Sequence, residues 1–200
     1  LDDRNCPRIL ELALLNSLHQ SGVKNLMDQA VLRFAQKTPS AVQAIGSYGK
    51  IAELPFDFVR RRLSVVVQNP QGEQLMVCKG AVEEMLSVAT HLQDGDQRRL
   101  LDTEQRARLL KMAYRYNSDG FRVLLIATRR IPVEQAKSRY EAQDEREMTV
   151  QGLLTFLDPP KESAAQAIAA LTEHGVAVKV LTGDYEIITA NICREVGLEP

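Results

Sequence analysis

The chain is 200 residues long, has an apolar fraction of 44% and carries a formal net charge of −1 at pH 7. That length suits one large domain or one domain with part of another, and the apolar content is enough to form a core. A net charge near zero gives no general attraction to nucleic acid or to anionic lipid, so we expect no nucleic-acid partner. Local basic clusters must therefore supply any anion binding.

Cysteine spacing and apolar runs narrow the class of protein further. Cys6, Cys78 and Cys193 are far apart and form no CxxC pair, which argues for a reducing compartment and against a disulfide framework or a zinc site. No apolar run reaches the roughly 20 residues of a membrane-spanning helix, and no signal peptide is visible. Because the chain opens on Leu1 without a Met, we expect a fragment of a longer protein.

The first elements predicted along the chain are two helices and a β-hairpin. Helical spacing of apolar residues predicts helices over 8–20 and 24–37. A loop over 46–55 then leads into a short strand. Two apolar runs, 63–67 and 75–78, flank the turn NPQGE, and this pattern is typical of a hairpin.

The next stretch mixes helices and strands. We expect a short helix over 80–90 and then a turn at 94–96, followed by a helix that begins at a capping box of Asp102 and Gln105 and ends before Gly120. Strands are predicted over 121–128 and within 148–157. Mixed elements joined by hairpins predict an α+β domain in which helices flank an antiparallel sheet.

Beyond residue 151 the pattern changes to strict alternation. A strand over 152–157, a helix over 162–174, a strand over 176–181 and a helix over 186–196 follow one another. Such a βαβα unit builds a parallel sheet. We therefore predict two domains, residues 1–151 and 152–200, the second being only part of a parallel α/β fold.

Polar residues follow both strands of that unit. Asp158 comes after the first strand, and Thr182 and Asp184 come after the second. The carboxyl ends of parallel strands meet at one edge, where open α/β sheets bind ligands, and carboxylates with a hydroxyl suit magnesium and phosphate chemistry. The alternative is that both aspartates only cap the helices that follow.

The hairpin brings aromatic and basic residues together. Phe56 and Phe58 alternate, so they are either a core pair or a surface for a flat ligand. The three arginines at 60–62, Lys79 and Arg122 all lie near strand ends, where they could bind an anion such as a nucleotide. Solvated charges and an edge-strand lysine are the alternatives. No P-loop, G-x-G-x-x-G or nucleophile–histidine motif is present.

Five motifs in one order resemble the cytoplasmic region of a P-type ATPase over residues 12–200. They are FDFVRRRLSVVV at 56–67, KGA at 79–81, GFRVLLIA at 120–127, DPPK at 158–161 and LTGD at 181–184. Within that family the chain is most similar to bacterial magnesium-transporting enzymes, through GVKNLMDQAV at 22–31, PFDFVRRRLSVVV at 55–67, VCKGA at 77–81 and FLDPPKE at 156–162.

The resemblance implies a nucleotide-binding domain, and it implies a role for each matching residue. Phe56 would stack on adenine, Lys79 with Gly80 would line the adenine and ribose end, and Arg122 would contact the phosphates and help to bridge the domains. Asp28 stands where many relatives carry a Glu that touches the adenine amino group.

The second segment would belong to a phosphorylation domain with a haloacid-dehalogenase-like sheet. There Asp158, Thr182 and Asp184 would support the phosphorylation site, with Asp184 near its Mg²⁺. The family's D-K-T-G-T-L-T segment with the phosphorylated aspartate, its G-D-G-x-N-D segment and its membrane helices are absent from the sequence. We therefore expect the chain to bind ATP without forming the aspartyl phosphate.

For the intact protein, the resemblance implies magnesium transport driven by ATP and Mg²⁺ at the cytoplasmic face of the bacterial inner membrane. Its partners would be the remaining phosphorylation, actuator and transmembrane domains. The open apolar edge of half a sheet also predicts a tail that is disordered, swapped or paired in a dimer. Three alternatives remain: a transporter of another cation such as calcium, a soluble phosphatase, and a non-enzymatic interaction domain with a basic hairpin.

Overall fold

The computed structural model describes residues 6–22, 24–38, 42–43, 45–157, 162–181 and 186–199. The chain divides into two compact units. The first comprises Leu1–Arg108 and Leu124–Leu154, and the second comprises Leu109–Val123 and Thr155–Pro200.

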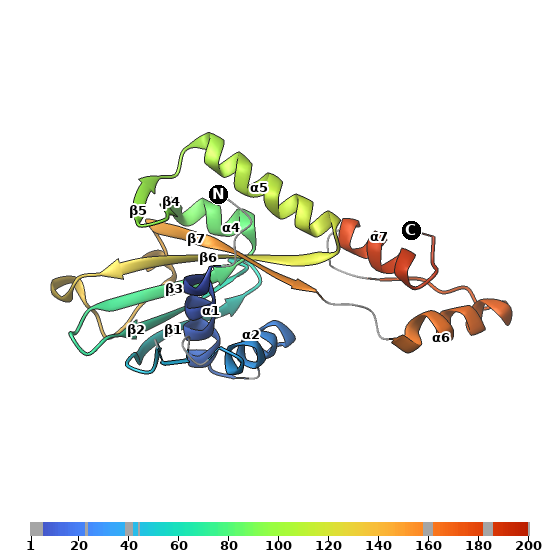
Figure 1. Cartoon of the computed structure of the whole chain (residues 1–200), viewed down its shortest axis with the longest axis horizontal. Coiled ribbons are helices and arrows are strands. Elements are labelled where there is room, and N and C mark those ends of the chain that lie inside the picture. The colour runs from blue at the N-terminus through green and yellow to red at the C-terminus, as the bar shows by residue number, and fades with distance from the viewer. Residues whose placement is uncertain are drawn as a thin grey trace. The chain divides into compact units, whose positions relative to one another are not determined.

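The strands form one seven-stranded sheet in the order β1-β2-β3-β6-β7-β4-β5 (Figure 1). The β1–β2, β2–β3, β3–β6 and β4–β5 pairs are antiparallel, whereas β4 and β7 pair in parallel. The predicted α+β class is therefore confirmed, but the expectation of a wholly antiparallel sheet was wrong at β4–β7. The strands are β1 Gly49–Asp57, β2 Arg62–Gln68, β3 Gln74–Gly80, β4 Ala89–Asp94, β5 Gln97–Leu100, β6 Phe121–Ile131 and β7 Met148–Leu157.

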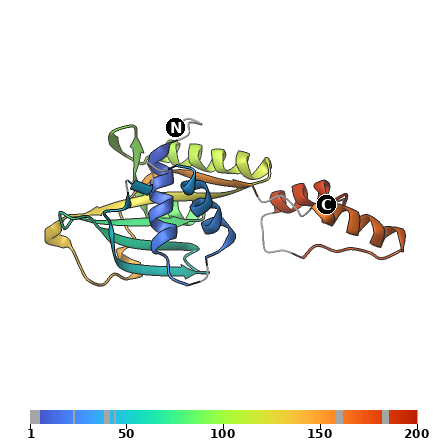
Figure 2. The ribbon, with the colours of Figure 1, turned by 60° about the horizontal axis from the view of Figure 1, so that its bottom comes forward.

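Helix α1 lies against the sheet, where it contacts β2 and β3, and α2 packs beside it (Figure 2). This cover contributes to the burial of the two strands: Leu63–Val67 are buried, and so is every residue of β3. The described helices are α1 Pro7–His19, α2 Leu26–Gln36, α4 Val82–Val88, α5 Thr103–Ser118, α6 Glu162–Glu173 and α7 Glu186–Glu195, with short 3₁₀ turns η1 Val133–Gln135 and η2 Ala142–Asp144.

Local turn and cap chemistry is as predicted. In the β2–β3 turn, the Asn69 side chain accepts hydrogen bonds from the backbone N–H groups of Gln71 and Glu73, at 3.1 and 2.9 Å. Before α5, the backbone N–H of Gln105 donates to Asp102 at 2.7 Å, and the backbone N–H of Asp102 donates to the Gln105 side chain at 3.2 Å. These are the reciprocal bonds of a capping box.

Other predicted elements differ from the structure. Among the described residues, 176–181 form neither helix nor strand, so the predicted strand there was wrong. A parallel strand has no hydrogen bonds without a neighbour, and β7 is instead part of the seven-stranded sheet. The loop expected over 46–55 was wrong too, since β1 begins at Gly49. Strands β4 and β5 were not predicted, because they are short and only partly apolar.

The predicted domain boundary near residue 151 and the predicted dimer stay predictions. Strand β7 runs through that boundary without a break. None of the described helices combines the length and the apolar character that a membrane crossing requires.

Candidate functional site

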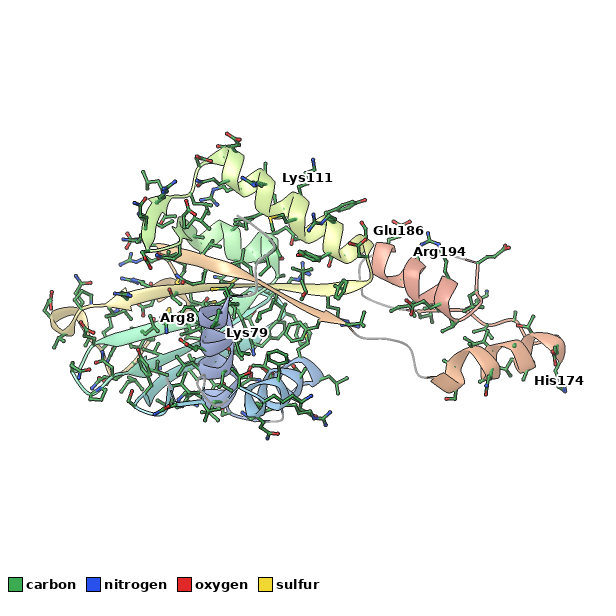
Figure 3. All side chains as sticks on the ribbon, viewed as in Figure 1. Arg8, Lys79, Lys111, His174, Glu186 and Arg194 are labelled. Atoms are coloured by element: carbon green, nitrogen blue, oxygen red, sulfur yellow. The ribbon has the colours of Figure 1, made fainter. Side chains whose placement is uncertain are left out.

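A buried ion pair joins two of the predicted site residues. Lys79, near the end of β3 (Figure 3), donates from Nζ to Asp28 Oδ1 and, at 3.0 Å, to Ser17 Oγ. Ser17 in α1 in turn donates to Asp28 Oδ1 at 2.7 Å. Asn25 caps α2 by accepting from the backbone N–H of Asp28 at 2.9 Å, which fixes Asp28 in the first turn of the helix. Three elements thus converge on one carboxylate.

This ion pair lies inside the protein and leaves one acceptor open. Burial lowers the pKa of Lys79, and the adjacent Asp28 charge only partly offsets the effect. Asp28 is fully buried, yet its Oδ2 has no hydrogen-bond partner among the described residues. A buried acceptor without a donor is unfavourable by about 1–3 kcal/mol, and the predicted contact of Asp28 with adenine stays a prediction.

Phe56 lies at the same end of the sheet as Lys79. Asp57 pairs with Arg62 across β1 and β2, and Arg62 pairs with Gly80 across β2 and β3. Since neighbouring strands are about 4.8 Å apart, the ends of β1 and β3 are separated by about 10 Å. That span is comparable with the length of an adenosine group.

The two phenylalanines are on the surface and not in the core. Phe56 is 50% exposed and Phe58 is 89% exposed. Their rings contact each other edge to face, with centroids 5.4 Å apart. Phe58 belongs to the turn after β1 and not to the strand, so the alternating core pair was a wrong interpretation. Two exposed rings in contact, one at the end of β1 and one on the turn after it, offer a platform for a flat ligand.

Two of the three arginines are bound to an internal carboxylate. Arg60 donates to both oxygens of Glu145 at 2.7 Å, and Arg62 donates to Glu145 Oε2 at 2.8 Å. Arg61 pairs with Glu84 at 2.9 Å. The interpretation of this run as solvated charge was therefore wrong for Arg60 and Arg62, and so was its interpretation as an open anion site.

Gly80 has a packing reason to be glycine. A Cβ added there would lie 2.4 Å from the Cβ of Arg62 and 2.7 Å from the carbonyl oxygen of Arg61. The close approach of the β1–β2 turn to the end of β3 therefore requires a residue without a side chain. Its predicted contact with nucleotide stays a prediction.

The remaining predicted residues belong to the second unit or lie outside the described residues. Arg122 is the second residue of β6, is half-buried and belongs to the second unit, and its phosphate contact stays a prediction. Asp158, Thr182 and Asp184 lie outside the described residues. Across the ranges that the structure covers, no group of three or more His, Cys, Asp or Glu side chains could hold a metal ion.

Sequence reasoning missed Glu145, Ser17 and the Asn25 cap that positions Asp28. Glu145 lies 85 positions after Arg60, in a charged stretch without periodicity, so no local pattern marks it as buried. Ser17 lies on a helix that was assigned only an apolar face. The only available signal was the cluster of arginines, which calls for a counter-charge if it is buried.

Comparison with known proteins places the chain in a family. It is 53% identical over 193 residues to "Magnesium-transporting ATPase, P-type 1" of Salmonella typhimurium LT2, covering 96% of this chain and 21% of the relative. It is 39% identical over 199 residues to the Escherichia coli K12 protein of the same name, covering 100% and 22%. "Calcium-transporting ATPase" of Bacillus subtilis is 26% identical over 172 residues, covering 86% and 19%.

The chain thus spans about a fifth of the length of these relatives. A family model described as the cytoplasmic domain N of P-type ATPases matches residues 10–163. The match covers most of the chain, including the Asp28–Lys79 pair, the exposed phenylalanines and the buried Glu145. The chain therefore belongs to the P-type ATPase family and contains its cytoplasmic domain N.

Proposed function

We propose that this chain is the ATP-binding part of a magnesium-transporting P-type ATPase. In the intact protein, ATP hydrolysis through an aspartyl phosphate would drive Mg²⁺ across the bacterial inner membrane, with this chain on the cytoplasmic side. The names of the relatives at 39–53% identity support magnesium, whereas the calcium transporter is only 26% identical.

The observation that carries the proposal is the open acceptor on Asp28 beside the ammonium of Lys79. An adenine amino group would donate to Asp28 Oδ2, which has no hydrogen-bond partner among the residues that the structure describes. The exposed face of Phe56, at the same end of the sheet, would stack on the base, since aromatic rings and bases attract each other without regard to sequence. Lys79 would lie between the base and the ribose.

Residues other than Asp28, Phe56 and Lys79 would bind the phosphates and support phosphoryl transfer. Mg²⁺ would accompany the ATP phosphates and neutralise charge during transfer. Arg122 is the candidate for contacting those phosphates, and Asp158, Thr182 and Asp184 are the candidates for the phosphorylation edge. Phosphoryl transfer depends mostly on positioning and on charge stabilisation, so this chain would contribute by holding the nucleotide while domain closure delivers it to the aspartate.

Titration calorimetry with MgATP tests the base-binding role. Phe56→Ala should weaken binding about tenfold, in line with stacking worth about 1–3 kcal/mol per base. The matched control is Phe34→Ala, which removes a ring of similar exposure from α2 and should leave the affinity unchanged. Equal affinities for Phe56→Ala and the unmodified chain would rule out the stacking role.

Comparing MgATP with MgITP tests the open acceptor without any mutation. ITP carries a carbonyl oxygen where ATP carries the amino group, so it would face Asp28 Oδ2 with a second acceptor. We expect ITP to bind about tenfold more weakly, since an unpaired buried acceptor is unfavourable by about 1–3 kcal/mol. A folded chain that binds neither nucleotide would instead support the interaction-domain alternative, and phosphatase activity would support the phosphatase alternative.

A further inference from the structure

Arg60 binds the residues on both sides of Phe56. Its Nη2 donates to the carbonyl oxygen of Pro55 at 2.6 Å, and its Nε pairs with the carboxylate of Asp57. Its backbone N–H also donates to Asp57 Oδ1 at 2.7 Å. One guanidinium therefore brackets the backbone that carries the candidate adenine-stacking ring, and its remaining nitrogen, Nη1, is bound by Glu145.

We propose that Glu145 is a positioning residue for the nucleotide site, because it holds Arg60 and thereby fixes the turn of residues 57–61 that presents Phe56 and Phe58. This inference rests on the proposed function of the chain in ATP binding. Glu145 does not contact the ligand in this account. It acts through Arg60 on the placement of the two rings.

Glu145 is well suited to act as a fixed anchor. Its side chain is fully buried and also accepts hydrogen bonds from Arg62 Nε at 2.8 Å and from Ser64 Oγ at 2.7 Å. The charges balance, because Glu145 and Asp57 together neutralise Arg60 and Arg62. Burial lowers the pKa of Arg60, but the hydrogen bonds and charges of Glu145 and Asp57 more than offset this and raise it. The guanidinium therefore stays charged at any physiological pH.

The segment that carries Glu145 is itself braced. Arg129 of β6 donates to the carbonyl oxygen of Asp144 at 2.9 Å, and Lys137 pairs with the Asp144 carboxylate at 2.7 Å. Burial opposes ionisation of Asp144, but the Lys137 contact and a backbone hydrogen bond outweigh it and lower its pKa. Glu145 thus transmits the position of β6 and of the 3₁₀ turn η2 to the β1–β2 turn.

The turn that Glu145 holds is unfavourable on its own. Phe58 and Val59 are 89% and 92% exposed, and Arg61 adopts a left-handed backbone with φ +46°. A turn built only for stability would bury those apolar side chains and place glycine or asparagine at residue 61. Unfavourable local geometry that is maintained by distant contacts is typical of ligand sites, and here the maintained feature is a pair of rings in contact.

The same turn is also tied to the Lys79 end of the site. The backbone N–H of Ala81, which follows Gly80, donates to the carbonyl oxygen of Arg61 at 3.0 Å. The backbone N–H of Arg61 donates to the carbonyl oxygen of Asp57 at 2.8 Å. Displacing the turn would therefore change the spacing between the Phe56 platform and the Asp28–Lys79 pair.

The test combines MgATP affinity with the mobility of the turn. Glu145→Gln keeps the shape of the side chain and removes its charge, and we expect it to weaken MgATP binding about tenfold. The control is Glu84→Gln, which removes the partner of the neighbouring Arg61 and should change the affinity less than twofold. Ser64→Ala, which removes a single hydrogen bond to Glu145, should weaken binding about threefold and remains usable if Glu145→Gln does not fold.

The chain contains no Trp, so Phe58→Trp supplies a single tryptophan on the turn, which can be excited selectively. In the ligand-free F58W protein, we expect Glu145→Gln or Ser64→Ala to lower the fluorescence anisotropy and Glu84→Gln to leave it unchanged. A double-mutant cycle adds Phe56→Ala: once the ring is gone, the tenfold effect of Glu145→Gln should shrink below threefold.

The outcomes separate the two proposals. If the unmodified chain binds MgATP and Glu145→Gln or Ser64→Ala changes neither affinity nor anisotropy, the positioning role is wrong while ATP binding stands. A lower melting temperature with fully additive effects on affinity also overturns it, because a purely structural role would not depend on the Phe56 ring. If the folded, unmodified chain binds no nucleotide, the proposed function fails and the positioning role fails with it.

Discussion

At one end of the β2–β3 hairpin, residues 69–73 close the chain through hydrogen bonds between positions only two to four apart. At the other end, Arg60 and Arg62 reach a carboxylate 85 and 83 positions further along the chain. The first end is stabilised by its own turn residues. The second is stabilised only when distant segments of the chain are in place. Such an arrangement suggests that the shape of the turn at residues 57–61 is itself needed.

The buried polar groups at the two ends also differ in charge. At the 69–73 end, buried Gln74 accepts from the hydroxyl of Tyr140 and donates to the carbonyl oxygen of Lys137 at 3.2 Å and to the side chain of Gln68 at 3.0 Å. All the groups that contact Gln74 are neutral, because Lys137 contributes its carbonyl oxygen and its ammonium group pairs with Asp144. At the other end, Glu145 and Asp28 are buried charges with buried or nearly buried counter-charges.

We interpret the charged end as the part of the sheet that the proposed nucleotide binding constrains. Buried ion pairs are a poor route to stability, since well-packed apolar residues often do as well. The neutral end shows that this chain can close a hairpin without them. We therefore expect changes at the charged end to alter both stability and nucleotide affinity, and changes at the neutral end to alter stability alone.

The largest effect in this comparison should come from Gly80→Ala at the charged end. The new Cβ would lie 2.4 Å from the Cβ of Arg62, so backbone must move, and we expect a loss of about 3 kcal/mol in the free energy of unfolding. Urea denaturation measures this loss, and calorimetry should show weaker MgATP binding because the turn is displaced.

Gly49→Ala is the matched control for that substitution. Gly49 lies in β1 of the same sheet, and a Cβ added there meets no atom within 4 Å. We expect a change of less than about 0.5 kcal/mol. Equal stability of the two variants would show that the close approach at Gly80 is relaxed without strain, and the requirement for glycine would be wrong.

A smaller effect is expected from Tyr140→Phe at the neutral end. The variant loses the hydrogen bond from the hydroxyl to Gln74 and the one it accepts from the Lys137 backbone at 3.1 Å. We expect the free energy of unfolding to fall by about 1.5 kcal/mol, with MgATP affinity unchanged within twofold. If Tyr140→Phe weakened MgATP binding as much as Gly80→Ala, the two ends would be coupled. The expectation that the neutral end affects stability alone would then be wrong.

Features that rest on local contacts could be predicted from the sequence, whereas features that rest on distant contacts could not. The 69–73 turn, the capping box before α5 and the helices over the sheet rest on neighbours within a few positions, so propensity and spacing are sufficient. Glu145 and Ser17 could not be predicted, because their burial depends on which distant segments pack against them. The strand expected at 176–181 fails for a related reason: strand propensity does not supply the neighbouring strand that a ladder requires.

Apart from the Gly49→Ala control, the smallest effect should come from Gly72→Ala in the 69–73 turn. Gly72 has φ +87°, and an added Cβ would approach nothing closer than the Val133 side chain at 3.8 Å. The substitution therefore isolates the strain of a left-handed alanine, about 1 kcal/mol, from any clash. Urea denaturation should show that loss, and calorimetry should show unchanged MgATP affinity. The affinity should not change, because the strain is local and the turn is closed by its own hydrogen bonds. A weaker affinity would mean that a change in this turn is transmitted along the strands to the charged end. The expectation that the neutral end affects stability alone would then be wrong.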